Sequence, residues 1–123
     1  KSSMMPKIVD KPWGHEEIIA HTDKYVMKKL FIKAGQRLSR QFHVEKDETI
    51  YVSKGLLLLD LSENDSESNI LKLSEGKSWR IKPKTIHRFT APEDQIVELF
   101  EVSTPELDDV VRLHDDYGRH NRA

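Results

Sequence analysis

The sequence contains no cysteine. This absence excludes disulfide bonds, thiolate nucleophiles and zinc sites built on cysteine. Histidine, aspartate, glutamate and glutamine are therefore the side chains left to bind a metal ion. Glycine and proline are also sparse, at five residues each, and they are scattered between other residue types. A low-complexity chain rich in glycine and proline is thus excluded as well.

Long hydrophobic runs and an excess of charge of one sign are also missing. The longest apolar run is Leu56 to Leu59, whereas a membrane-spanning helix needs about 18 residues, and the N-terminus lacks the apolar centre of a secretory signal. Twenty lysines and arginines stand against 21 acidic residues, which leaves a net charge of −1. We therefore expect a cytoplasmic protein that binds neither nucleic acid nor a membrane.

The size of the chain allows one small hydrophobic core. It has 123 residues, of which 37% are hydrophobic and 33% are charged. A second core would not fit in this length. The segment Lys1-Ser2-Ser3 precedes Met4-Met5, so we expect residues 1–5 to be a remnant of an expression vector or a disordered N-terminus. Residues 6–123 are expected to form a single domain.

Short segments rich in β-branched, aromatic and leucine residues alternate with turn residues between Glu16 and Val102. This pattern predicts an all-β fold of the sandwich or barrel type. The polar stretch from Ser62 to Asn69 is expected to be an exposed loop, and Glu106 to Arg112 to form one or two helical turns in an otherwise irregular tail. The expected strands are Glu16 to Ala20, Tyr25 to Lys33, Arg37 to His43, Glu48 to Ser53, Leu56 to Leu61, Ile70 to Leu73, Ser78 to Ile81, His87 to Thr90 and Gln95 to Val102.

Four side chains in these segments form a candidate metal site. Gln41 and His43 are two residues apart in an expected strand, so both leave the same face, with Cα atoms about 6–7 Å apart. Glu48 follows a polar stretch that turns the chain, and His87 opens a later strand. This mixed nitrogen and oxygen set suits one divalent ion, with Zn²⁺ expected first and Fe²⁺, Mn²⁺, Co²⁺ or Ni²⁺ as alternatives.

The spacing around these residues resembles the first motif of the cupin superfamily, G-x5-H-x-H-x3,4-E-x6-G. Here Gly35 is followed by Gln41, His43, Glu48 and Gly55 without a gap, and glutamine replaces the first histidine. The resemblance implies a single-domain cupin, a double-stranded β-helix or jelly-roll barrel, over residues 6–123.

The second cupin motif, G-x5-P-x-G-x2-H-x3-N, fits more loosely. Gly76 and His87 keep the register, whereas Lys82, Lys84 and Ala91 replace the proline, glycine and asparagine. The metal-binding position is thus retained, but the loop before it departs from the pattern.

A narrower resemblance covers nearly the whole chain. Several segments look like the cupin domain of type II phosphomannose isomerases: Lys11-Pro12-Trp13-Gly14, Leu38 to His43, Thr85 to Phe89, Glu101-Val102 and Asp115 to Arg119. In that family the metal ligands are Gln, His, Glu and His, so Gln41 matches the pattern. The resemblance implies a metal-dependent isomerase of mannose-6-phosphate isomerase type, whose cavity holds one metal ion and a sugar phosphate.

The expected reaction moves a proton between C1 and C2 of the sugar, which requires a base and a group that binds phosphate. Arg88 is the first candidate for the phosphate because a guanidinium binds it in bidentate fashion. Strand alternation partly opposes this role, since Arg88 follows His87 directly; Lys84, Arg112 and Arg119 are alternatives. Glu98 or a lysine is a candidate base, and the sequence leaves the base open.

Two other functions remain compatible with the sequence. One is a metal-dependent cupin oxygenase acting on a small organic substrate, although such an enzyme would more naturally carry a third histidine in place of Gln41. The other is a sugar-binding cupin without turnover, which the degenerate residues Lys82 and Lys84 favour. In each case a homodimer is expected, because small barrels often pair through strand edges or sheet faces.

Overall fold

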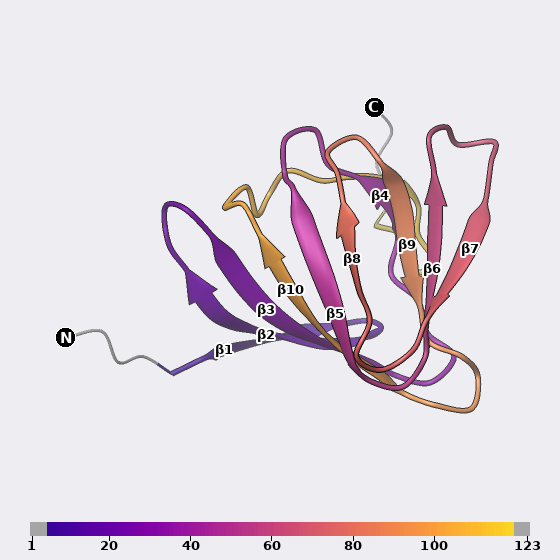
Figure 1. Cartoon of the computed structure of the whole chain (residues 1–123), viewed down its shortest axis with the longest axis horizontal. Helices are drawn as coiled ribbons and strands as arrows, with labels where there is room; N and C mark the ends of the chain where they lie inside the picture. Colours follow the sequence, from indigo (N-terminus) through magenta and orange to yellow (C-terminus); the bar gives the residue numbers. More distant parts are fainter. Residues whose placement is uncertain (1–4, 120–123) are drawn as a thin grey trace.

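The computed structural model describes residues 5–119, which form antiparallel strands in two sheets (Figure 1). The described residues contain no helix, and so none long and apolar enough to cross a membrane. The all-β prediction is confirmed. The strands are β1 (Lys7–Lys11), β2 (Gly14–His21), β3 (Val26–Ile32), β4 (Arg40–Phe42), β5 (Glu48–Lys54), β6 (Leu57–Ser62), β7 (Asn69–Leu73), β8 (Ser78–Ile81), β9 (Ile86–Thr90), β10 (Val97–Ser103) and β11 (Val111–His114).

The two sheets face each other as the layers of a sandwich. One contains six strands in the order β1-β2-β3-β10-β5-β8, and the other contains five in the order β11-β4-β9-β6-β7. Strands that are consecutive in the sequence, such as β5 and β6, lie in different sheets. The chain therefore crosses repeatedly between the layers, and segments far apart in the sequence become neighbours.

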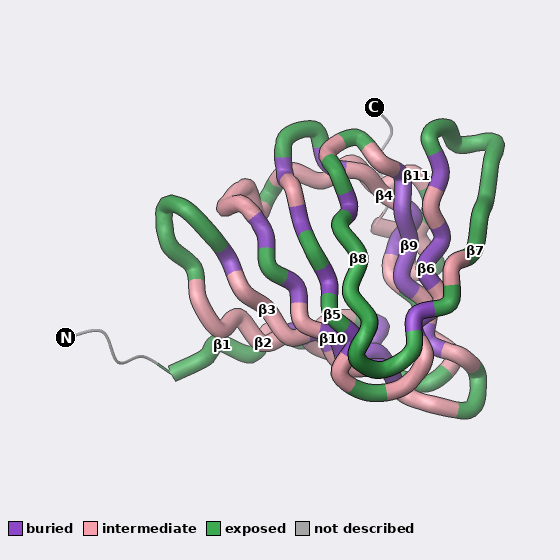
Figure 2. Tube along the Cα trace, viewed as in Figure 1, coloured by how far each residue is buried: buried purple, intermediate pink, exposed green. Residues whose placement is uncertain are grey.

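Alternation along the strands builds the interior. In β5 the side chains of Glu48, Ile50 and Val52 are buried, while Thr49 and Tyr51 are exposed. Residues of seven strands and of the adjoining turns form the core between the sheets, and Figure 2 marks the buried stretches of the chain. It comprises Trp13, Leu30, Ile32, Ile50, Val52, Leu57, Leu59, Leu73, Ile81, Phe89, Ala91, Val97 and Leu99.

The interior changes from apolar to polar along the strands. On β10, Leu99 is part of the core, and the next inward residue, Glu101, is buried but charged. On β5 the same change occurs from Ile50 to Glu48. Because both changes occur toward the same end of the paired strands, that end of the sandwich is available for polar chemistry.

Two strands at the sheet edges differ from the sequence prediction. Lys7–Lys11 pairs with β2, although its charged residues and exposed edge gave no hydrophobic pattern. The helical turns expected in the tail are wrong, because Val111–His114 forms β11 and pairs with the three-residue strand β4. The residues before it, 104–110, are irregular. The residues expected to be a vector remnant lie, except for Met5, outside the described part of the chain.

The C-terminal tail is fastened along the five-stranded sheet. Arg37 makes two hydrogen bonds to the carboxylate of Asp116, at 2.7 and 2.8 Å. The hydroxyl of Tyr117 donates to the side-chain oxygen of Gln36 at 2.6 Å. These contacts hold residues 104–119 beside the polar end of the sandwich, where the tail supplies part of the site.

Candidate functional site

Three of the expected metal ligands converge on one point. The Nε2 atoms of His43 and His87 lie 3.3 and 3.2 Å from the same carboxylate oxygen of Glu48. His43 directly follows β4, Glu48 begins β5 and His87 lies on β9, so both sheets contribute. All three side chains are buried.

The hydrogen bonds of the two histidines determine which ring nitrogen faces Glu48. Nδ1 of His43 donates to the main-chain oxygen of Asp109 at 2.6 Å, and Nδ1 of His87 donates to that of Thr85 at 2.9 Å. A carbonyl oxygen can only accept, so in the neutral rings each Nε2 presents a lone pair to the carboxylate.

Two imidazole nitrogens and a carboxylate oxygen that direct their lone pairs at one another repel unless a cation lies between them. Both Nε2 atoms are buried and make no hydrogen bond within the described residues. Such atoms call for a partner, and imidazole nitrogens with a carboxylate oxygen are ligands that bind divalent transition metals and zinc. The residues present therefore fit a metal ion, and the donor set leaves its identity open.

Gln41, the fourth expected ligand, lies on the same face as the cluster. It is the direct partner of His87 in the pairing of β4 with β9, and it lines a cavity beside the three residues. Its side-chain oxygen accepts a hydrogen bond from the hydroxyl of Ser39. The structure thus brings together His43, Glu48 and His87 and places Gln41 in the adjoining wall.

A buried charged network adjoins the cluster. The ammonium group of Lys46 lies 3.0 Å from a carboxylate oxygen of Glu101 and 3.5 Å from one of Glu48. Burial opposes the charge on Lys46, but the two carboxylates outweigh it and raise the pKa of Lys46 above its ordinary value. Lys46 therefore remains a cation between the two acids.

The two carboxylates of this network are shifted in opposite directions. Burial and the neighbouring charge of Glu48 raise the pKa of Glu101. Burial also opposes ionisation of Glu48, but the adjacent side chains of His43 and His87 outweigh burial and hold the pKa of Glu48 well below its ordinary value. Paired acids with divergent pKa values are a common arrangement for proton transfer.

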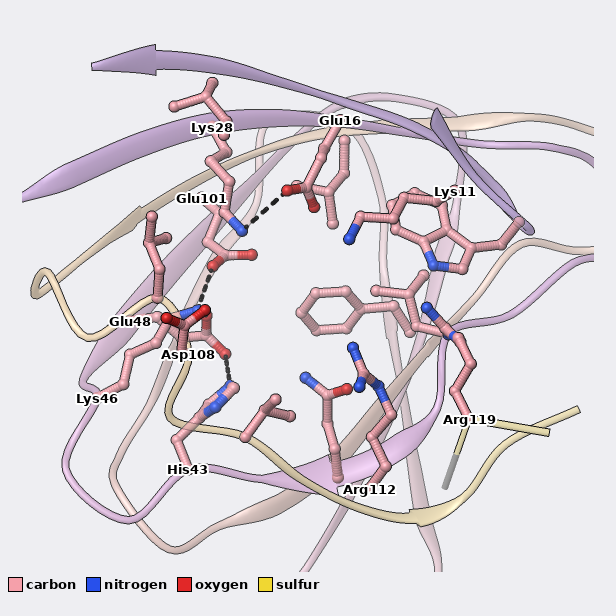
Figure 3. Close-up of a pocket in the computed structure, with 18 residues that line it drawn as sticks. Lys11, Glu16, Lys28, His43, Lys46, Glu48, Glu101, Asp108, Arg112 and Arg119 are labelled. Atoms are coloured by element: carbon pink, nitrogen blue, oxygen red, sulfur yellow. Dashed lines mark hydrogen bonds and ion pairs between the residues drawn. The ribbon is translucent and has the colours of Figure 1, made fainter. Parts of the chain in front are cut away.

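The cluster opens onto a cavity of about 230 Å³ between the sheets. Figure 3 shows His43, Glu48 and Lys46 on one side of it, and Lys11, Arg112 and Arg119 on the opposite side. Lys28 and Glu16, 3.4 Å apart, lie on the wall near Glu101. The cavity therefore has one end with the candidate metal ligands His43 and Glu48 and an opposite end with the cations Lys11, Arg112 and Arg119.

Two residues expected to act on the substrate lie elsewhere. Glu98 leaves the outer face of β10 and pairs with Lys29 at 3.1 Å. Arg88 donates to the main-chain oxygens of Leu38 and His114, at 2.9 and 3.1 Å, and so supports the tail. Neither residue is part of the cavity lining. Strand alternation explains both placements, since Arg88 follows the inward His87 and Glu98 precedes the inward Leu99.

Glu101 and Lys46 are not among the functional residues that the sequence pattern predicts. Alternation on β10 contained a usable signal for Glu101, because it lies two residues beyond the buried Leu99 and shares its face. Lys46 lies in the turn between His43 and Glu48, and no periodicity indicates where a turn residue points. Arg112 and Arg119 were named only as alternatives, and they reach the cavity because the tail folds back on the sandwich.

Comparison with known proteins agrees with this architecture. A family model described as "Mannose-6-phosphate isomerase C-terminal" matches residues 1–115. A mannose-1-phosphate guanylyltransferase of Escherichia coli is 33% identical over 114 residues, which are 90% of this chain and 23% of that protein. The xanthan biosynthesis protein XanB of Xanthomonas campestris is 32% identical over the same shares of the two chains. The chain thus spans about a quarter of the length of these relatives.

Solved structures share the fold. A cupin of RmlC-like type from Shewanella frigidimarina superposes with a TM-score of 0.71 at 17% identity, covering 84% of this chain and 86% of that one. Together with the two-sheet topology, this match confirms the predicted cupin architecture.

Proposed function

The chain belongs to the mannose-6-phosphate isomerase C-terminal family, and on this basis we propose that it binds one divalent metal ion and a sugar phosphate and interconverts an aldose phosphate with a ketose phosphate. The observation that carries the proposal is the two-ended cavity, with metal ligands at one end and three cationic side chains at the other. The guanylyltransferase activity in the name of one relative is not part of the proposal, since the chain covers 23% of that protein.

The metal end of the cavity would receive the part of the sugar that reacts, C1 and C2 with their oxygens. His43, Glu48 and His87 would hold the ion, and Gln41 would complete the set from the adjoining wall. A divalent ion bound there would act as a Lewis acid toward the carbonyl and hydroxyl oxygens of the sugar. The buried position of the ligands would keep water from competing for these oxygens.

The cationic end supports a phosphorylated substrate. Lys11, Arg112 and Arg119 lie across the cavity from the metal ligands (Figure 3). Guanidinium groups bind phosphate through paired, charge-assisted hydrogen bonds. The volume of about 230 Å³ is below the roughly 300–1,000 Å³ of sites for drug-sized ligands, and so suits a small polar molecule. A sugar phosphate would place its two polar ends at the two ends of the cavity.

Glu101 is the best-placed group for the proton transfer. Its buried carboxylate faces the cavity, is not one of the expected metal ligands, and has a pKa raised by burial and by Glu48. A raised pKa brings a carboxylate closer to the value a general base needs near neutral pH. Glu101 would take the proton from C2 of the aldose and return it to C1, while the hydroxyl proton on O2 passes to O1.

Lys46 would hold Glu101 in position for this step. It contacts Glu101 at 3.0 Å and Glu48 at 3.5 Å, and it has little freedom to leave, because 5% of its side chain is exposed. A fixed ammonium between the two acids lowers their mutual repulsion. It therefore permits a catalytic carboxylate close to the metal site.

The experiment is deuterium exchange at C2 of hexose and pentose phosphates in heavy water, followed by NMR with the zinc-loaded chain. We expect exchange for at least one sugar phosphate and a loss of about 10²–10⁴-fold in Glu101→Gln. Glu98→Gln is the matched control, because it makes the same change on the outer face of the same strand. Binding without exchange by the parent chain would overturn the isomerase and favour the sugar-binding alternative.

A further inference from the structure

One tail residue, Asp109, contacts the metal-ligand segment at four points. Its main-chain oxygen accepts the hydrogen bond from Nδ1 of His43 at 2.6 Å. Its carboxylate accepts hydrogen bonds from the main-chain N–H groups of Val44, Glu45 and Lys46, at 3.0, 2.7 and 2.9 Å. A residue 66 positions away in the sequence thus contacts a ligand and the three residues that follow it.

These contacts replace the hydrogen bonds that a strand would supply. Residues 43–47 lie between β4 and β5 and belong to neither strand. Such a turn is flexible unless its N–H groups are paired, and Asp109 pairs three of them in succession. At the far end of the turn, Asp47 exchanges two hydrogen bonds with Thr104, both at 3.0 Å. The segment from 104 to 109 therefore spans the whole connection between His43 and Glu48.

We infer that Asp109 is a positioning residue for the metal site, because it sets the ring orientation and tautomer of His43 and the path of the turn that leads to Glu48. This inference rests on the proposed function, since it requires a metal ion at His43, Glu48 and His87. Partners that orient a ligand commonly contribute 10- to 100-fold to metal affinity. Asp109 does so from a segment in which the sequence shows no metal-binding pattern.

The test compares Zn²⁺ affinity across three variants of the full chain, by titration against a competing chelator. Asp109→Ala removes the acceptor of three N–H groups, and we expect it to weaken Zn²⁺ binding by about 10- to 100-fold. Asp109→Asn retains one accepting oxygen, and we expect an intermediate loss. Asp94→Ala removes the same charge from an exposed turn, and we expect it to bind Zn²⁺ as the parent chain does.

A second measurement separates positioning from general destabilisation. In ¹⁵N NMR spectra of the metal-free chain, the Nδ1–H of His43 should exchange faster with solvent in Asp109→Ala than in the parent chain. The Nδ1–H of His87, which donates to Thr85, is the internal reference and should remain protected. Equal loss of both signals in Asp109→Ala and Asp109→Asn would indicate a merely structural role and overturn the inference.

The possible failures are distinguishable. If the parent chain binds no Zn²⁺, the proposed function fails. If the parent chain binds Zn²⁺ and both Asp109 variants bind it equally well, the proposed function stands and the positioning role is refuted. A loss of the same size in Asp94→Ala would also refute it, because the effect would then reflect net charge alone.

Discussion

Gln41 of β4 and His87 of β9 are direct cross-strand partners in the five-stranded sheet. Residues paired in this way have Cα atoms about 4.5–5.5 Å apart and side chains on the same face. The pairing therefore brings two expected ligands together from positions 46 residues apart, and His87 also contacts Glu48 of the other sheet. His87 thus joins Gln41 of its own sheet to Glu48 of the other sheet.

Replacing His87 is expected to abolish metal binding. The parent chain should carry one Zn²⁺ per chain in native mass spectrometry, and His87→Ala should carry none, because the two remaining ligands of the cluster hold a metal weakly. His21→Ala, at the exposed end of β2, is the control and should bind as the parent does. Undiminished stoichiometry in His87→Ala would refute the assignment of this ligand.

Phosphate binding should depend on Arg119 and be insensitive to Arg88. We expect Arg119→Gln to raise the dissociation constant of mannose 6-phosphate about 10- to 100-fold, the effect of losing a hydrogen bond to a charged group, and to leave that of mannose unchanged. Arg88→Ala removes the donor to two main-chain oxygens of the tail, so it should lower the free energy of unfolding. Calorimetric titration with both sugars measures these constants. If Arg88→Ala weakened the binding of mannose 6-phosphate and left that of mannose unchanged, Arg88 would be the phosphate-binding residue instead.

The stability of the tail should decrease in acid through Asp115. Burial opposes ionisation of this carboxylate, but three hydrogen bonds from Arg119 outweigh burial and lower the pKa of Asp115 below its ordinary value of 3.8. Since the folded chain binds this proton less readily than the unfolded chain, the stabilisation is present above pH 3.8 and is lost as the pH falls through the depressed value.

Denaturant unfolding at a series of pH values tests this expectation. The free energy of unfolding should fall less steeply below pH 4 in Asp115→Asn than in the parent chain, because asparagine does not titrate. Parallel curves for the two proteins would show that Asp115 makes no net contribution to acid stability.

Gly55 and Gly76 offer a matched test of backbone strain against crowding. Their φ angles are +87° and +86°, and alanine in this region costs about 1–2 kcal/mol. A Cβ at Gly76 would meet no atom within 4 Å, whereas one at Gly55 would lie 2.3 Å from the main-chain oxygen of Ile96. Urea unfolding should therefore show Gly55→Ala to be less stable than Gly76→Ala by a further 1–3 kcal/mol, roughly the cost of overpacking. Equal losses of unfolding free energy in the two variants would mean that the backbone at Ile96 moves aside at little energetic cost.

The sequence was sufficient to predict most strands and the convergence of His43, Glu48 and His87. Turn residues and alternation delimit the inner strands, and the spacing of His43 and Glu48 reflects a short connection between two strands. It was insufficient for β11, because four residues at a sheet edge carry too little pattern to distinguish a strand from a helical turn. The expected homodimer and the sugar phosphate ligand stay predictions.

The positions of Glu98 and Arg88 outside the cavity lining have one physical origin. Charged residues occur on both faces of a strand, and composition does not reveal which face is inward. Glu101 points inward because it continues the row of Val97 and Leu99 on one face of β10. The alternation of the neighbouring hydrophobic residues therefore predicts which charged side chains point inward, and the type of charged residue does not. Asp109 and Arg119 reach the site because the tail folds back on the sandwich, and only the tertiary structure defines that path.

The division of the expected ligands between the two sheets has a thermodynamic consequence. Glu48 belongs to the six-stranded sheet, whereas His87 belongs to the five-stranded sheet, so an ion bound by both would cross-link the two layers at the end where the apolar core is absent. Separating the layers would then require releasing the ion. The unfolding temperature should consequently rise with free zinc concentration, following the logarithmic dependence of a ligand that binds only the native state.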